Sequence, residues 1–246
     1  MDRIIYTSMT GASAAAARQA VLANNLANVS TNGFRAELST FRSVPLNGQG
    51  SSSRVFALEA THGHSELPGP VQRTGRNLDV MATGNSWLAV QGLDGTEAYT
   101  RNGAFEVSPA GILVNSIGLP VLSDGGAPID IPPGSAVAFG FDGTVSAKVG
   151  NLPATNLGRI KIVTPNADEK LKRGDDGLFR SATGDPLGND QNARLQTGAL
   201  EGSNVNAVET MVGMIEAARQ FEVQMRLLQS AESGDKSASQ LLGVQG

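Results

Sequence analysis

Few side chains in this sequence have the types and spacing that enzymatic or metal chemistry requires. His62 and His64 are the only histidines among 246 residues, and a single glycine separates them, so they could supply two metal ligands. Further ligands would have to be carboxylates, since no cysteine is present for a thiolate site, a disulfide or a nucleophile. Two histidines in a solvated loop are the simpler interpretation, and we expect no metal site.

Motifs for nucleophilic catalysis and nucleotide binding are also missing. The sequence contains no Gly-x-Ser-x-Gly, Gly-x-Gly-x-x-Gly or phosphate-loop spacing, and the segment from Gly84 to Leu88 lacks the second glycine of a nucleophile elbow. The net charge of -4 gives no electrostatic reason to expect phosphate binding. We therefore expect no enzymatic activity, no cofactor, no small-molecule substrate and no nucleic-acid partner.

Both ends of the chain carry the apolar periodicity of a helix. Residues 1 to about 29 contain no proline and a single glycine, and their apolar residues recur three or four positions apart. Residues from about 204 to 229 repeat this pattern, while Gly234 and nearby serines predict a weaker helix between 230 and 239. The N-terminal stripe is a seam rich in alanine and methionine that buries little area per turn, so the helix should need close neighbours to be stable. Neither end resembles a secretory signal or a membrane span.

The middle of the chain has the texture of an all-β domain. Turn signals at Asp94-Gly95, Asn102-Gly103, Asp124-Gly125, Asp142-Gly143 and Asp176-Gly177 predict tight primed hairpin turns. Short apolar runs between them predict strands at 87–91, 105–107, 112–114, 137–141 and 159–163. The region from about 43 to 70 has no clear period and is expected to be a loop or an extended connector.

Three segments carry a resemblance to a known family. Residues 24–35 read Asn-Asn-Leu-Ala-Asn-Val-Ser-Thr-Asn-Gly-Phe-Arg, which is similar to the N-terminal signature of flagellar rod and hook proteins. Residues 78–90 with 99–105 resemble the first strands of the β domain in that family, and residues 198–209 resemble its C-terminal motif. In physical terms, Asn32-Gly33 can end the first helix in a left-handed turn, which makes these two residues the predicted chain turn.

The resemblance implies a structural subunit of the flagellar basal-body rod, most similar to the proximal rod proteins. Such a subunit would assemble helically with copies of itself and with other rod proteins, and would leave the cytoplasm by the flagellar type III export apparatus without a cleavable signal. It would lie in the rod that spans the periplasm, transmit torque from motor to hook, and not insert into a membrane. The residues that we expect at subunit contacts are Ile5, Met9, Ala12, Ala16, Ala23, Asn24, Asn25, Leu26 and Asn28, together with Val205, Val208, Met211, Ile215, Ala218, Phe221, Met225 and Leu228.

The predicted architecture is α+β. Residues 1–34 and 204–246 would form a helical assembly domain with coiled-coil-like pairing, residues 76–185 a β domain, and residues 35–75 with 186–203 the connectors. The competing interpretation is a secreted adhesin or carbohydrate-binding module with a helical stalk, in which Trp87 would be the sugar platform. A single tryptophan inside an apolar strand is more simply buried.

Overall fold

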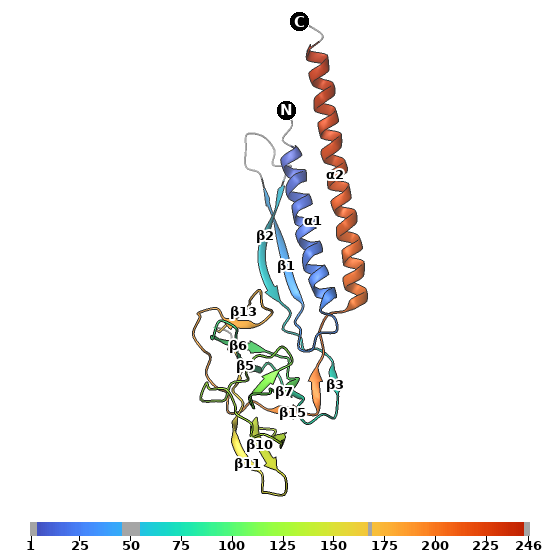
Figure 1. The fold of residues 1–246 in the computed structure, drawn as a ribbon. Helices are drawn as coiled ribbons and strands as arrows, with labels where there is room; N and C mark the ends of the chain where they lie inside the picture. Colours follow the sequence, from blue (N-terminus) through green and yellow to red (C-terminus); the bar gives the residue numbers. More distant parts are fainter. Residues whose placement is uncertain (1–3, 46–54, 167–168, 244–246) are drawn as a thin grey trace. The chain divides into compact units, whose positions relative to one another are not determined.

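The computed structural model describes residues 4–45, 55–166 and 169–243 and has an α+β fold, as the sequence predicts (Figure 1). The chain divides into two compact units. Unit 1 consists of residues 1–29, 37–64 and 205–246, and unit 2 of residues 30–36 and 65–204. Unit 1 contains both helices and one hairpin, whereas unit 2 contains all the remaining strands.

Unit 1 is built from two antiparallel helices and a β-hairpin. Helix α1 (Ile4–Ala27) lies beside helix α2 (Ala207–Gly243), and strands β1 (Glu37–Pro45) and β2 (Val55–His64) lie along α1 (Figure 1). Small residues allow the helices to approach closely: a Cβ atom on Gly11 would lie 2.9 Å from the Gln224 side chain, and one on Gly213 would lie 3.3 Å from Leu22. The helix pair therefore buries little apolar area per turn.

The C-terminal helix is longer than the sequence pattern predicts. The weakening expected between residues 230 and 239 does not end α2, which continues to Gly243. Serine hydroxyls in this stretch donate to carbonyls earlier in the helix, as Ser237 Oγ does to the Ser233 carbonyl at 2.9 Å. Lys236 also pairs with Glu232 at 2.8 Å, one turn apart. These hydrogen bonds and ion pairs within the helix give the polar side chains partners, so the side chains do not draw the backbone into non-helical hydrogen bonds.

Within the loop or connector predicted for residues 43–70, residues 43–45 and 55–64 belong to the strands of a hairpin. Strands β1 and β2 pair antiparallel over nine residue pairs, with an irregularity between Thr40 and Phe41 that disturbs the period-two pattern. The buried Asn25 side chain bonds both backbone groups of Glu37, accepting from its N–H at 2.8 Å and donating to its carbonyl at 2.9 Å. The sequence of these strands has no clear apolar–polar alternation, so it does not predict them. They are stabilised instead by packing on α1.

Unit 2 is a set of small antiparallel sheets. The largest has the order β12-β5-β6-β14-β13, and a three-stranded sheet has the order β11-β10-β9. The two-stranded sheets are β7-β8, β15-β4 and β16-β3. The strands of unit 2 are β3 (Val71–Arg73), β4 (Val80–Ala82), β5 (Trp87–Gln91), β6 (Glu97–Thr100), β7 (Phe105–Val107), β8 (Leu113–Asn115), β9 (Ser135–Phe139), β10 (Thr144–Val149), β11 (Thr155–Arg159), β12 (Ile162–Val163), β13 (Leu171–Arg173), β14 (Phe179–Ser181), β15 (Leu195–Thr197) and β16 (Ala199–Glu201).

Strand β5 is covered on both faces. Leu88 and Val90 belong to the larger hydrophobic cluster of unit 2, whereas Trp87 and Ala89 belong to a second cluster on the opposite face. Trp87 is 3% exposed and packs against Phe179 with ring centroids 4.5 Å apart. The strand predicted at 87–91 is confirmed, and its continuous apolar character follows from burial on both sides.

One turn geometry recurs six times in unit 2. In each case the first residue donates to the carbonyl four positions on, and a glycine at the fourth position, with positive φ, donates back to the first carbonyl. These are three-residue hairpin loops of the kind that ends in a left-handed glycine, and the predicted primed two-residue turns are wrong because only glycines have positive φ among the described residues. The six turns occupy residues 92–96, 108–112, 115–119, 123–127, 140–144 and 174–178.

Aspartate side chains explain part of the turn preference. Asp94, Asp142 and Asp176 each accept from the backbone N–H two positions on, at 3.1 Å. The Asn102-Gly103 pair, by contrast, forms no hairpin turn: the Gly103 carbonyl accepts from Val80 N at 3.0 Å, joining separate segments.

Candidate functional site

The first candidate surface is the exposed face of α1. Tyr6 is 61% exposed and Met9 is 57% exposed, and the exposed residues Ala16, Ala23 and Asn24 continue this face along the helix. The helix carries one charged residue in 24, Arg18. A helix face exposed to water ordinarily carries charged side chains, so this face has the composition of a contact surface.

The second candidate surface is the outer face of α2 near its beginning. Val208, Met211, Val212 and Ile215 are each at least half exposed. Their three- and four-residue spacing places them on one side of the helix, and the buried Ala217 lies on the other. The apolar stripe that the sequence predicts in this region therefore points largely away from the partner helix of the same chain.

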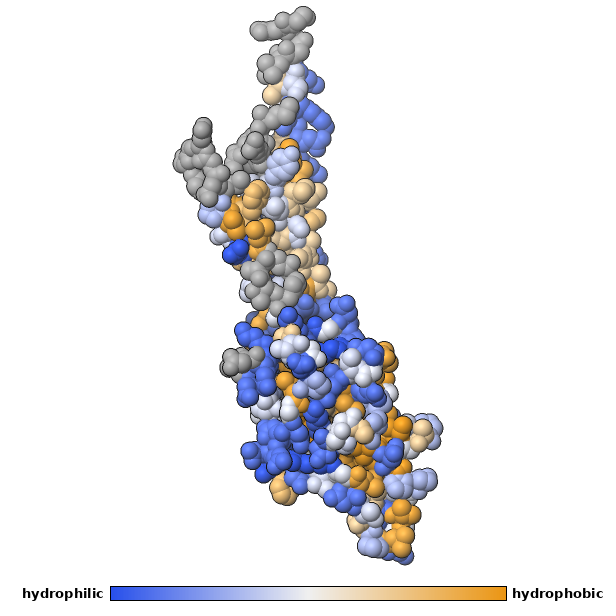
Figure 2. All heavy atoms as spheres, turned by 90° about the vertical axis from the view of Figure 1, so that its left-hand side faces the viewer, coloured by the Kyte–Doolittle hydropathy of each residue, from blue (hydrophilic) through white to orange (hydrophobic). Residues whose placement is uncertain are grey.

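The remaining predicted contact residues lie in different environments. Ala12 and Asn25 are buried inside unit 1, so the single chain already covers them. Phe221 and Met225 are 37% exposed. The half-buried members of the set are Ile5, Leu26, Asn28, Val205, Ala218 and Leu228. The β1-β2 hairpin adds exposed apolar residues that the sequence analysis missed, namely Leu38, Val55 and Leu58, and apolar side chains are visible on this part of unit 1 (Figure 2).

The predicted chain turn coincides with a close backbone contact in unit 2. Gly33 has φ 70°, and its N–H donates to the Glu201 carbonyl at 2.7 Å. A Cβ atom at Gly33 would lie 2.4 Å from both the Arg101 carbonyl carbon and the Asn102 nitrogen. Asn32 is half-buried. Glycine is therefore required at position 33 by conformation and by space.

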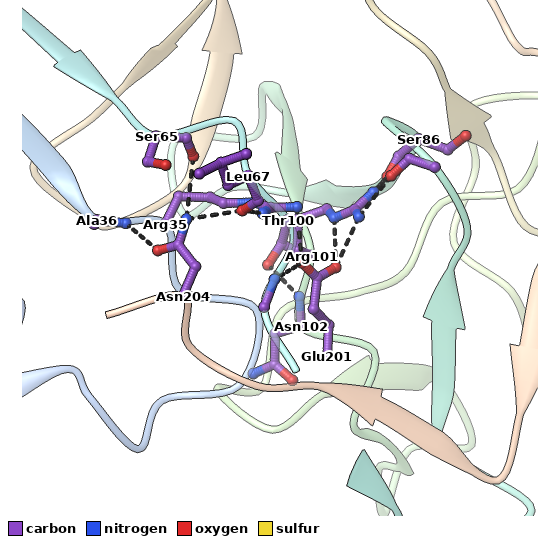
Figure 3. A network of polar contacts seen from close by, with 12 residues as sticks. Arg35, Ala36, Ser65, Leu67, Ser86, Thr100, Arg101, Asn102, Glu201 and Asn204 are labelled. Carbon is purple, nitrogen blue, oxygen red and sulfur yellow. Dashed lines mark hydrogen bonds and ion pairs between the residues drawn. The ribbon is translucent and has the colours of Figure 1, made fainter. Parts of the chain in front are cut away.

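A buried cluster of charged residues lies next to this turn. Glu201 accepts from Arg35 at 2.8 Å through Oε1 and from Arg101 at 2.8 Å through Oε2, and all three side chains are 2% exposed (Figure 3). Glu201 Oε1 also accepts from Gly69 N at 2.9 Å. One carboxylate thus bonds two buried guanidinium groups, an arrangement that is costly to break because it leaves a charge unpaired.

Backbone carbonyls accept from terminal guanidinium nitrogens of both arginines. Arg101 donates to the carbonyls of Ser86 and Gly84, the latter at 2.8 Å, and Arg35 donates to the Leu67 carbonyl. Burial lowers the pKa of Arg35, and the nearby Glu201 carboxylate opposes that shift. These carbonyl dipoles help two positive groups to share a single negative partner.

Asn204 extends the cluster through its side-chain amide. Its Oδ1 accepts from Ala36 N at 2.7 Å, and its Nδ2 donates to the Leu67 carbonyl at 2.8 Å (Figure 3). The segments that carry the family resemblance contain Arg35, Arg101, Glu201 and Asn204, but the sequence alone assigns these residues no role. Their location within the three resembling regions is the feature of the sequence that could have identified them as a functional group.

A pocket of about 430 Å³ opens beside the cluster, and Glu66, Met81 and Asn85 contribute to its lining along with Arg101 and Glu201. Both buried charged groups already bond within the chain. Among the residues that the structure describes, no three or more metal-ligating side chains form a group. His62 belongs to β2, and its side chain is not among those that the structure describes.

The sugar-platform interpretation of Trp87 is wrong, because Trp87 is buried against Phe179 and cannot present its ring to a ligand. Residues 4–45, 55–166 and 169–243 include no helix with the length and hydropathy of a membrane span.

Comparisons with known proteins cover almost the whole chain. Three family models match: "Flagella basal body rod protein" at residues 5–35, "Flagellar hook protein FlgE/F/G D1 domain" at 81–147, and "Flagellar basal body rod FlgEFG protein C-terminal" at 196–241. The flagellar basal-body rod protein FlgF of Salmonella typhimurium is 44% identical over 99% of this chain and 100% of its own length. FlgF of Escherichia coli is 43% identical over the same shares. FlgG of Buchnera aphidicola from Schizaphis graminum is 28% identical over 96% of this chain and 98% of its own length.

The three matched regions contain residues 24–35, 81–90, 99–105 and 198–209 of the segments on which the sequence resemblance rests, and they include the helix faces and the charged residues of the buried cluster. Together with the full-length similarity to FlgF proteins, these matches show that the chain belongs to the flagellar basal-body rod protein family and is a structural subunit of the rod.

Proposed function

We propose that this subunit lies in the proximal rod, where it assembles helically with copies of itself and with other rod proteins and transmits torque from motor to hook. Its partners bind the exposed faces of α1 and α2. The role is structural, without catalysis. The observation that carries this proposal is the exposure of Tyr6 and Met9 on one helix and of Val208, Met211 and Ile215 on the other.

The energetics of the helix pair support a need for neighbours. The two helices approach each other at Gly11 and Gly213, and the buried apolar residues of α1 and α2 are the alanines Ala12, Ala15 and Ala217, which bury little apolar surface. Isolated helices are marginal in water, and a long pair with such a shallow contact gains little from its own packing. Covering the exposed apolar side chains in a polymer would contribute roughly 25 cal/mol for each Å² removed from water.

The length of α2 gives a second reason to expect neighbours. Gly11 meets Gln224 and Gly213 meets Leu22, which fixes an antiparallel register in which Ile4 lies opposite roughly residue 231. The remaining part of α2, to Gly243, lies beyond the described end of α1. We infer that other subunits cover this part of α2.

Coiled-coil-like packing suits the inner face of α2. Residues spaced alternately four and three apart, including Thr210, Met214, Ala217, Gln224 and Leu228, are less exposed than most of their neighbours. The exposed stripe through Val208, Met211 and Ile215 supplies a second contact face. A helix with two such faces can join one partner in its own chain and another in the polymer, and a heterologous contact of this kind generates a helical assembly.

Charge substitutions on the exposed faces test the assembly model. Met9→Asp and Ile215→Asp should leave the isolated chain folded, because both side chains reach water, yet abolish incorporation into rods, because the aspartate would be buried unpaired at a contact. Leu93→Asp is the matched control, since Leu93 is 91% exposed and lies in unit 2. Incorporation is measured by immunoblotting purified basal bodies, and motility by spreading in soft agar. Normal rods in both helix variants would reject these faces as contacts.

Export by the flagellar type III apparatus, without a cleaved signal, is the remaining part of the proposal. Helices that gain little from their own packing can stay unfolded during passage through a narrow channel and become ordered in the polymer. Mass spectrometry of the N-terminal peptide of the subunit from purified basal bodies tests this point. A peptide that begins after a removed leader would contradict it.

A further inference from the structure

The chain passes between its two units at four points, which follow residues 29, 36, 64 and 204. Residues of unit 2 at three of these points bond to one another. Ser65 N donates to the Ala36 carbonyl at 2.8 Å, and Asn204 N donates to the Phe34 carbonyl at 3.3 Å. The side-chain amide of Asn204 joins the same three segments, accepting from Ala36 N and donating to the carbonyls of Leu67 and, at 3.4 Å, Ser65.

The charged side chains fix the same segments to the body of unit 2. Glu201 precedes Asn204 by three residues and bonds Arg35, which precedes Ala36. Through Arg101 it also reaches the carbonyls of Gly84 and Ser86, which lie just before the start of β5. Its third bond, from Gly69 N, holds the segment that follows Leu67. Each crossing segment thus has at least one bond to Glu201 or Asn204, or to a neighbour that they hold.

We propose that Glu201 and Asn204 are positioning residues that hold segments 33–36, 65–69 and 201–204 together as one rigid attachment. A force carried along the chain from unit 1 into unit 2 passes through these segments. If the connections moved independently, the force would distort them one at a time, whereas a bonded set moves as one. The consequence for torque rests on the proposed function; the bonding and its test concern unit 2 alone.

A simpler role would be general stabilisation of unit 2, and the Glu97-Lys161 pair provides the control. This pair has a separation of 2.7 Å, its side chains are 9 to 10% exposed, and the hydrogen bond that Glu97 accepts from Tyr99 also lies outside the crossing segments. Glu97→Gln and Glu201→Gln both remove a buried carboxylate charge. Only Glu201→Gln should loosen the crossing segments selectively.

Hydrogen exchange of the full-length chain, followed by NMR at individual amides, distinguishes the two roles. The reporters are the N–H groups of Gly33, Ala36 and Ser65, which donate to the Glu201 carbonyl, to Asn204 Oδ1 and to the Ala36 carbonyl. We expect Glu201→Gln, Arg35→Met and Asn204→Ala to accelerate exchange at these amides by about tenfold or more relative to amides of β5. Glu97→Gln should leave that ratio unchanged.

The double variant Arg35→Met with Glu201→Gln should accelerate exchange at Gly33 by less than the product of the two single effects, because both changes remove the Arg35–Glu201 ion pair. Native ratios in all three single variants would overturn the proposal, as would an equal acceleration in Glu97→Gln. If Glu201→Gln does not fold, as judged by Trp87 fluorescence, the Arg35→Met and Asn204→Ala ratios decide the matter. Rod incorporation of the Met9 and Ile215 variants tests the proposed function separately.

Discussion

Substitution of Gly33 by alanine separates two physical demands at one position. Gly33 has φ 70°, a conformation that costs a residue with a Cβ atom about 1 kcal/mol or slightly more. The new Cβ would also lie 2.4 Å from backbone atoms of Arg101 and Asn102. Backbone atoms cannot rotate away as a flexible side chain can, so overpacking should add about 1 to 3 kcal/mol. We expect Gly33→Ala to cost about 2 to 4 kcal/mol in the free energy of unfolding.

Two other glycines provide matched controls. Gly75 also has φ 70°, but a Cβ there would meet nothing within 4 Å, so Gly75→Ala should show the conformational cost alone. Gly103 has no positive φ, but its Cβ would lie 1.9 Å from the Val80 carbonyl oxygen, so Gly103→Ala should show the steric cost alone. The Gly75 variant therefore measures the cost of positive φ, the Gly103 variant measures the cost of a steric clash, and the Gly33 variant measures both costs together.

Thermal unfolding followed by Trp87 fluorescence is the assay, because the only tryptophan of the chain is buried in unit 2. Each kcal/mol should lower Tm by roughly 2 to 4 °C in a protein of this size. Gly75→Ala should therefore lower Tm by roughly 2 to 4 °C and Gly33→Ala by roughly 4 to 16 °C. Equal Tm values for these two variants would refute the argument from close approach.

Two further predictions concern polar groups of unit 2. The Arg180 side chain, by hydrogen bonding, holds the pKa of Asp176 below its usual 3.8, so the ionised form stabilises the fold above that value, and the contribution is lost as pH falls through the folded pKa. Asp176→Asn should lower the free energy of unfolding in urea at pH 6 by less than about 1 kcal/mol, since the pair is partly exposed, and this loss should shrink as pH falls below 3.8; a loss that stays constant as the pH is lowered would contradict this. The buried Tyr99 hydroxyl accepts from Leu187 N at 2.6 Å and donates to Glu97, so Tyr99→Phe should cost about 1 to 3 kcal/mol by thermal unfolding. The other tyrosine, Tyr6, is 61% exposed, and Tyr6→Phe should leave Tm unchanged; matching Tm values for the two variants would count against the role of the hydroxyl.

The elements that the sequence predicts well are those with strong local patterns. The N-terminal helix, expected to about Val29, ends at Ala27, and the strand at 87–91 has the predicted bounds. The hairpin β1-β2 could not be predicted in this way, because its strands are stabilised by α1 and by the Asn25 amide, and neither contact leaves a period in the sequence. Glycine positions predicted most of the turns, but they did not predict the turn type. The sequence indicates where a positive φ is tolerated, whereas the strand register decides how many residues the loop contains.

The candidate site was predictable to a similar extent. Apolar spacing identified Met9, Val208 and Ile215, which are exposed in the chain. It could not separate these from Ala12, which the chain covers itself, and the signature segment did not reveal that Asn25 is buried, because the packing of each helix depends on contacts distant in sequence. The same limit applies to Glu201, whose partners Arg35 and Arg101 lie 166 and 100 positions away.

The hydrogen bond from Asn204 N to the Phe34 carbonyl has a consequence for how proteins on this plan can change in size. The two residues lie next to each other although 169 residues separate them in the chain. Extra residues added at one of the short turns between them would leave both ends of the intervening segment in place. Relatives can therefore differ in the bulk they present to their surroundings while retaining a common pair of helices.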